Sequence, residues 1–206
     1  MSLQNRVTPW GDLVAVADRG LMFGNRGVLH DANKRIVRYN QGQRWIVCLL
    51  EFRGRHRPIM RPGHYTELFF LDEATALAAG HRPCAECRRQ KYEAFRCAWA
   101  SAQSGRAETL PSATEIDARL HEDRLSAPGI RRTYRAEIAA LPDGVFIESD
   151  GEAWLIWRTD LLRWTPGGYS WRIPKPAGSV VTVLTPHATV ETITAGYLPS
   201  AHPSAG

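Results

Sequence analysis

Two cysteines separated by two residues, Cys84-Ala85-Glu86-Cys87, are the clearest chemical signal in the sequence. Two thiolates at this spacing can bind one tetrahedral metal ion, as they do in structural zinc sites. Nearby arginines and the start of a helix would favour the thiolate forms, which suits metal binding and redox chemistry alike. A redox pair is expected in a thioredoxin-like βαβ context, which this stretch lacks. Two inert thiols are the remaining alternative, and we predict zinc.

A structural zinc ion takes four protein ligands, so two more must come from other parts of the chain. We predict Cys48, in a strand-like run, and His64, in an arginine-rich segment. A strand cysteine is often a small buried hydrophobe, and a histidine among arginines is often only solvated. Other candidates therefore stay open: His30, His56, His81 and Cys97.

The elements around the cysteine pair are expected to be helical, over about residues 72–127. Asp72 is a good N-cap for an alanine-rich helix, and Ser112 with Glu115 forms a capping box. A helix from about Glu86 carries apolar residues at helical spacing through Trp99. These signals place the pair at a turn that leads into a helix.

Short strands are expected on both sides of the helical part. Runs of β-forming residues between turn signals predict an antiparallel meander over about residues 10–71, including strands near 27–30, 35–39 and 44–52. Similar runs return over about 130–206, and the tail after Tyr197 is expected to be loose or to lie over the surface. We predict an α+β fold with regions 1–129 and 130–206, which could form one domain.

The composition is that of an ordinary globular protein, with 44% hydrophobic and 23% charged residues among 206. No apolar run is long enough to cross a bilayer, and the first residues lack the apolar stretch of a secretory signal. We therefore expect a cytoplasmic protein with no membrane partner. Four cysteines in a reducing compartment also favour a metal site over disulfides.

Basic residues are clustered, and the net charge of +5 favours polyanionic partners. Arginine is much commoner than lysine in the clusters, and its planar guanidinium suits bidentate contacts with phosphate. The simpler alternative is a set of solvated surfaces. We predict that nucleic acid contacts Arg53, Arg55, Arg57, Arg61, Arg82, Arg88 and Arg89.

The run from Leu68 to Arg88 resembles the zinc-binding domain of Ada-type DNA-repair proteins. It shows the stretch Ala79-Gly80-His81-Arg82-Pro83-Cys84-x-x-Cys87, with a histidine where the family usually has an aromatic residue. The resemblance implies a strand, a short alanine-rich helix, and two of four zinc ligands from the cysteine pair. It also implies contact with DNA, so we favour DNA over RNA.

The chain departs from the family upstream of this run. The family supplies its first two ligands from a Cys-x-x-x-Cys pair, one thiolate of which accepts a methyl group from a DNA phosphotriester. The corresponding stretch here, near residues 53–64, offers His56 and His64 but no cysteine. We therefore expect no methyl-transfer activity.

Three functions follow from these observations. The first is a zinc-binding protein that contacts nucleic acid through an arginine-rich face. The second is a metal-assisted enzyme that processes nucleic acid, for which no known nuclease motif assigns catalytic residues. The third is a protein-interaction module in which zinc only supports the fold. A water ligand on the zinc would favour the second, and the absence of salt-sensitive nucleic-acid binding would favour the third.

Overall fold

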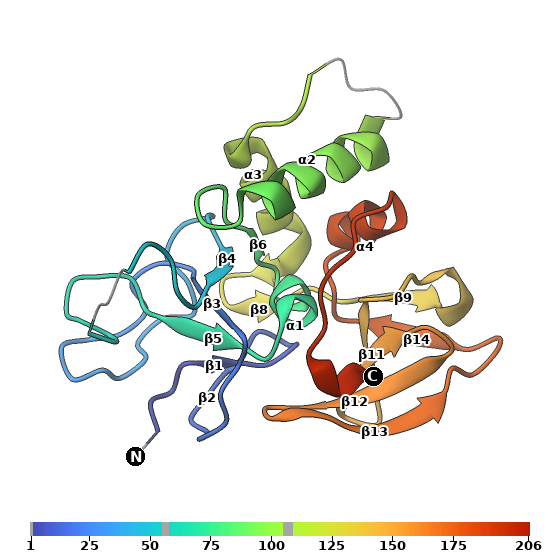
Figure 1. Ribbon diagram of the computed structural model, residues 1–206, viewed down its shortest axis with the longest axis horizontal. Helices are drawn as coiled ribbons and strands as arrows, with labels where there is room; N and C mark the ends of the chain where they lie inside the picture. The colour runs from blue at the N-terminus through green and yellow to red at the C-terminus, as the bar shows by residue number, and fades with distance from the viewer. Residues whose placement is uncertain (1, 55–57, 105–108) are drawn as a thin grey trace.

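The computed structural model describes residues 2–54, 58–104 and 109–206 and confirms the α+β fold. One sheet is built from the N-terminal part and a second from the C-terminal part, with helices beside both (Figure 1). Among the described residues, no helix is both long and apolar enough to cross a membrane.

The N-terminal sheet has six short strands in the order β2-β1-β5-β3-β4-β6. The pairs β1·β5 and β4·β6 are parallel and the others antiparallel, so the sheet is not a simple up-and-down meander. The strands are β1 (Arg6–Val7), β2 (Leu13–Val14), β3 (Met22–Asn25), β4 (Ile46–Leu49), β5 (Leu68–Phe70) and β6 (Arg82–Pro83).

The strands expected near 27–30 and 35–39 do not form, and this prediction is corrected. Only a single bridge, between His30 and Ile36, joins the two runs. The carboxylate of Asp31 accepts hydrogen bonds from the backbone N–H groups of Asn33 (2.8 Å) and Arg35 (2.9 Å). Such local side-chain bonds compete with a strand ladder, so the segment closes into a loop.

Local capping signals set the starts of two helices, as predicted. The helices are α1 (Glu73–Ala78), α2 (Arg89–Ser104), α3 (Ala113–Arg124) and α4 (His187–Thr194). Asp72 accepts from the backbone of Thr75 at 2.8 Å, and Ser112 and Glu115 form the reciprocal capping box. The sequence analysis did not anticipate α4.

The C-terminal sheet is antiparallel throughout, with the order β13-β12-β11-β10-β14-β9. Its strands are β9 (Tyr134–Glu137), β10 (Phe146–Ser149), β11 (Glu152–Trp157), β12 (Asp160–Thr165), β13 (Gly168–Pro174) and β14 (Val180–Val183). A small hairpin, β7 (Leu125–Ala127) with β8 (Ile130–Arg131), connects α3 to this sheet.

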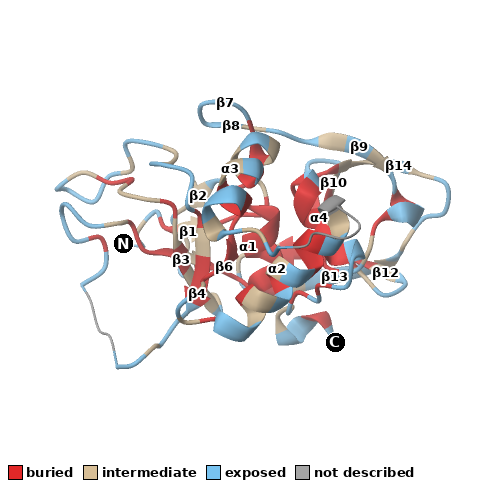
Figure 2. Cartoon of the chain, turned by 90° about the horizontal axis from the view of Figure 1, so that it is seen from above, coloured by how far each residue is buried: buried red, intermediate tan, exposed pale blue. Residues whose placement is uncertain are grey.

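The largest apolar core contains residues from both sides of position 129. Phe95 of α2 and Leu120 of α3 are fully buried in the same cluster as Ile147 of β10 and Val183 of β14. Figure 2 shows this buried material in the middle of the molecule, around α1, α2 and α4. The helices therefore pack against the C-terminal sheet as well as the N-terminal one.

The C-terminal tail lies on the body of the protein and is held there by two buried carboxylates. Glu73 accepts hydrogen bonds from the hydroxyl of Tyr197 and from the backbone N–H of Ser200 at 3.0 Å. Asp72 accepts from the hydroxyl of Tyr169 at 2.6 Å and the backbone N–H of His202 at 2.8 Å. The tail is therefore anchored to α1 and lies over the surface, which is one of the two arrangements expected from the sequence.

Replacing Ser112 with alanine should lower the free energy of unfolding by about 1 kcal/mol, because the N-cap of α3 loses its hydrogen bond to Glu115. Urea denaturation would measure this change. Ser101→Ala, at an exposed position in the last turn of α2, is the control and should change stability little. Equal stability of the two variants would contradict a stabilising role for the cap.

Candidate metal centre

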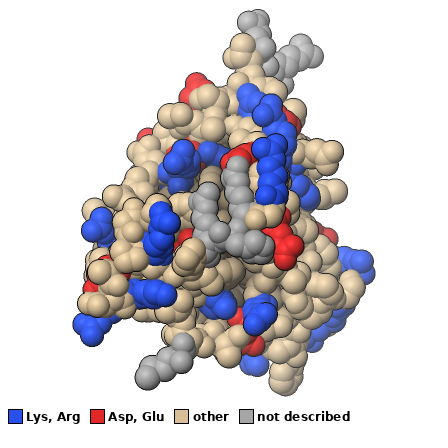
Figure 3. Space-filling view, turned by 60° about the vertical axis from the view of Figure 1, so that its left-hand side comes forward, with Lys and Arg blue, Asp and Glu red and all other residues tan. Residues whose placement is uncertain are grey.

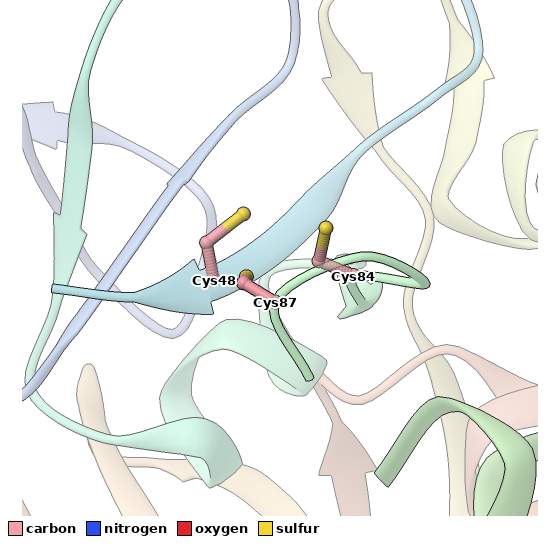
Figure 4. A group of neighbouring side chains, drawn as sticks. All are labelled: Cys48, Cys84 and Cys87. Carbon is pink, nitrogen blue, oxygen red and sulfur yellow. The ribbon is translucent and has the colours of Figure 1, made fainter. Parts of the chain in front are cut away.

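Three cysteines come together at the edge of the N-terminal sheet. The Sγ atoms of Cys48, Cys84 and Cys87 all lie within 4.8 Å of one another. Figure 4 shows Cys48 on the strand β4 and the other two on the loop that follows β6. Sulfur atoms around a tetrahedral zinc ion, at Zn–S distances of about 2.3 Å, would be about 3.8 Å apart. A small inward movement would therefore allow these thiolates to hold a metal ion.

The parallel pairing of β4 with β6 places Cys48 beside the cysteine pair. Ile46 lies opposite Arg82, and Val47 opposite Pro83. The backbone N–H of Cys84 continues the pairing by donating to the carbonyl of Val47 at 2.9 Å. Since the next residue of β4 is Cys48, this register brings a strand thiol to residues almost forty positions later in the chain.

The loop after β6 is shaped to carry two ligands. The backbone N–H of Arg88 donates to the carbonyl of Cys84 at 3.2 Å, which closes a turn before α2 starts at Arg89. The backbone N–H of Glu86 donates to the sulfur of Cys84 at 3.4 Å. Such N–H···S bonds stabilise a thiolate without competing for its remaining lone pairs.

The three thiols are linked by hydrogen bonds that shift their pKa values. Hydrogen bonds from Cys48 and then Cys87 lower the pKa of Cys84, whereas the hydrogen bonds to Cys84 and Cys87 raise the pKa of Cys48. One sulfur thus takes the negative charge that its neighbours stabilise. A bound cation would replace these protons, because metals are held by thiolates rather than thiols.

Arg82 and Arg88 are structural and do not face solvent, which corrects the prediction that they contact phosphates. Arg82 is 2% exposed and makes a bidentate ion pair with Asp117 of α3, at 2.8 and 2.7 Å. Arg88 is 7% exposed and pairs with Glu73 at 2.8 Å. The two ion pairs hold the cysteine loop against α1 and α3. Arg82 also lines the groove described below, but its guanidinium is engaged by Asp117, so neither arginine is counted among the phosphate contacts.

Among the described residues, the group that could hold a metal consists of the three cysteines. His64 is not part of this group, and its exposed ring lies against Arg61. His81 is buried between Trp45 and Phe70, at ring distances of 5.3 and 4.7 Å.

The other candidate ligands also lie apart from the cluster or cannot be placed. His30 is hydrogen-bonded to the hydroxyl of Thr66 at 2.6 Å. Cys97 is exposed on α2. His56 lies outside the described residues. The described residues therefore bring together three candidate protein ligands, all of them sulfur atoms.

A groove of about 760 Å³ opens beside the three cysteines, which form part of its wall. Aromatic rings from β3, β5 and the adjoining loops also line it, with Phe23 lying 6.0 Å from Phe69 and 6.2 Å from Tyr65. Phe52 and the exposed Arg44 complete the mixture of aromatic and basic groups. These groove residues were not predicted from the sequence, because nothing local in the chain marks rings from separate strands as sharing one surface.

The remaining predicted arginines differ in how available they are. Arg53 is exposed, with its guanidinium 5.0 Å from the ring of Phe52, and Arg61 is exposed beside His64. The side chain of Arg89 is 73% exposed and pairs with Glu93 at 3.0 Å. Arg55 and Arg57 lie outside the described residues.

Basic side chains are scattered over the face shown in Figure 3, and acidic side chains lie between several of them. The face is therefore not one continuous cationic surface. Arg44 lines the groove, and the guanidinium of Arg53 lies 5.0 Å from the ring of Phe52, which also lines it.

The site is therefore a three-thiol cluster in the wall of an aromatic groove with exposed arginines nearby. Comparison with protein-family models, with curated proteins and with solved structures finds no match to this chain.

Proposed function

We propose that this protein holds a structural zinc ion through Cys48, Cys84 and Cys87 and binds nucleic acid in the adjacent groove. The observation that carries the proposal is the position of the three-thiol cluster in the wall of a groove that also presents aromatic rings and arginines. Three sulfur ligands favour zinc over the harder cations, which prefer oxygen.

The groove combines the two kinds of contact that bind unpaired nucleic acid. Aromatic side chains such as Phe23, Tyr65 and Phe69 offer surfaces on which bases stack. Arginines at positions 44, 53 and 61 supply charge for the phosphates. The bases of an intact duplex are already stacked on one another, so the proposed ligand is a single-stranded or locally unpaired segment. The resemblance to the Ada zinc domain favours DNA.

Zinc has a structural role in this proposal. By joining β4 to the loop before α2, the ion would fix the groove wall and the register of β4 with β6. The upstream Cys-x-x-x-Cys pair of the Ada domain is absent from the sequence, so no methyl transfer is included.

Replacing Arg44 and Arg61 together with glutamine should weaken binding to a fluorescent single-stranded oligonucleotide. For a single strand, each lost phosphate contact reduces the slope of log binding constant against log salt concentration by about 0.7. The slope of the double variant should therefore be smaller by about 1.4. Tyr65→Leu keeps an apolar side chain but removes the ring, and should weaken binding by about 1–3 kcal/mol. Anisotropy titrations at several salt concentrations would measure all three effects.

Arg158→Gln, in the turn between β11 and β12, is the matched control and should bind like the natural protein. Unchanged affinity and salt slope in the groove variants would refute the proposed binding surface. If the zinc-loaded protein showed no salt-sensitive binding at all, a protein-interaction module stabilised by zinc would be the better explanation.

A metal-assisted enzyme that processes nucleic acid is the second candidate, and one observation favours it. The groove reaches the cysteines, so a coordination position not taken by the three sulfurs would face the bound chain. A water molecule in that position would be activated by zinc. X-ray absorption on the zinc-loaded protein distinguishes the candidates: four protein ligands favour the binding protein, and an oxygen from water favours the enzyme.

A further inference from the structure

Two buried arginines and one half-buried arginine lie together near the C-terminal end of α3. Arg26 follows β3, Arg124 ends α3 and Arg131 lies on β8. Arg26 and Arg124 are completely buried. The guanidinium carbon of each lies over the ring of Trp45, at 4.8 and 4.0 Å.

Arg131 lies between the other two, as the contacts of two glycines show. A Cβ atom on Gly80 would be 2.8 Å from Cδ of Arg124 and 3.1 Å from Nη1 of Arg131. A Cβ atom on Gly11 would be 3.5 Å from Cδ of Arg131 and 3.6 Å from Nη1 of Arg26. Both glycines have positive φ angles, and any side chain there would enter the space that the three arginines share.

Carbonyl groups satisfy only part of the hydrogen-bonding capacity of these arginines. Arg26 donates to Gly11 at 2.9 Å, Arg124 to Gly80 at 2.9 Å and also to Gln43, and Arg131 to Ala78 at 2.6 Å and Leu184 at 3.1 Å. Buried nitrogen atoms without a partner remain on all three: Nε and Nη1 of Arg26, Nε of Arg124 and Nη1 of Arg131.

The surrounding carboxylates attract the three arginines only from a distance: Asp12 acts on Arg26 and Arg131, and Asp117 acts on Arg124. In the described part of the chain, no carboxylate lies within ion-pair distance of any of the three arginines. Asp117, which attracts Arg124, is already engaged by Arg82. Tyr39 favours the charge of Arg26, and its ring centre lies 4.0 Å from the guanidinium carbon of Arg26.

The energetic cost of this arrangement is large. An unpaired buried charge costs several kcal/mol even after relaxation, and here three like charges lie together. Burial, together with repulsion from Arg131, lowers the pKa of Arg26 to about 10 and that of Arg124 to about 9. Arg26 and Arg124 therefore remain cationic at neutral pH, whereas burial lowers the pKa of His81 and favours its neutral ring.

We propose that Arg26, Arg124 and Arg131 form an internal binding site for a small inorganic anion, such as a halide or a phosphate-like oxyanion. The unpartnered N–H groups are donors that an anion would accept, and its charge would offset the repulsion between the guanidiniums. The phosphates of a polymer cannot reach a site this deeply buried. The anion site is thus independent of the nucleic-acid groove, and either proposal can fail without the other.

Thermal unfolding of the full-length protein at constant ionic strength would test the site. Sodium gluconate, whose anion is too large to enter, is replaced stepwise by chloride, bromide or phosphate. At a concentration about a hundred times its dissociation constant, the favoured anion should raise the Tm by roughly 5–10 °C. A rise in Tm that saturates with chloride but not with phosphate would indicate a halide site. A rise that saturates with phosphate but not with chloride would indicate an oxyanion site. Equal Tm values in every salt would overturn the proposal.

Two variants make the test specific. Arg131→Gln removes one guanidinium from the cluster and should lose the anion-dependent rise in Tm. Arg132→Gln, at the exposed neighbouring position, should keep it. An identical rise in both variants would place the anion elsewhere and contradict the proposed site.

A bromide-soaked crystal of the natural protein gives a readout that does not require the Arg131 variant to fold. For a halide site, an anomalous peak among the three guanidinium groups is expected. For an oxyanion site, a phosphate soak should show tetrahedral density there. Only water at this position in both crystals would overturn the proposal.

Discussion

Replacing Cys48 with serine should remove most of the zinc from the purified protein, lowering the content from about one ion per chain. The serine hydroxyl is a poor zinc ligand, and the two remaining sulfurs come from one short loop. Elemental analysis and thermal unfolding of the same preparation would measure metal content and Tm, and both should fall. The affinity loss should exceed the roughly 10–100-fold typical of losing a residue that only orients a ligand.

Cys97→Ser is the matched control, because this cysteine is exposed on α2 and lies outside the cluster. It should retain its zinc and its Tm. Cys84→Ser and Cys87→Ser should behave like Cys48→Ser. Full zinc content in all three cluster variants would rule out the proposed metal site.

Replacing Glu73 with glutamine should have the largest effect on stability among single substitutions outside the metal site. It leaves the guanidinium of Arg88 buried without its counter-charge and weakens the attachment of the tail through Tyr197 and Ser200. Breaking such a buried pair typically costs about 3–5 kcal/mol. Urea denaturation would measure the loss.

Glu93→Gln is the comparison variant for this prediction. Glu93 pairs with Arg89 and Arg96 on the surface of α2, where its side chain is 33% exposed. Exposed pairs of this kind contribute about 0–1 kcal/mol. Similar losses in the two variants would show that the burial of Glu73 adds nothing to its ion pair.

The contribution of Glu73 should also depend on pH. Burial raises the pKa of its carboxyl, but the hydrogen bonds and charge of Arg88 outweigh this effect, so the net pKa is lowered. The pKa of a glutamate in the unfolded chain is about 4.3. A group whose pKa is lower in the folded protein stabilises the fold at pH values above about 4.3, and this stabilisation is lost as the pH falls through the folded pKa. The stability difference between the natural protein and Glu73→Gln should therefore shrink below about pH 4. An unchanged difference between pH 7 and pH 3 would contradict this linkage.

The sequence by itself determined the features that depend on neighbouring residues. The N-cap at Asp72 and the capping box at Ser112 and Glu115 lie within one helical turn, so their signals identified the starts of α1 and α3. The spacing of Cys84 and Cys87 placed two thiols on one turn for the same reason. Alternating apolar runs between turn residues likewise indicated strands on both sides of the helices.

The tertiary structure alone decided which distant residues meet. Cys48 was one of several candidates in the sequence, and the parallel pairing of β4 with β6 brings it to the cysteine pair. Arg82 and Arg88 resemble surface charges in the sequence, but Asp117 and Glu73 hold them inside. Such partners are 35 and 15 residues away, so no local pattern predicts them. The arginine cluster has the same origin. Its members come from separate parts of the chain, and the packing of Arg26 and Arg124 against Trp45 buries these two side chains.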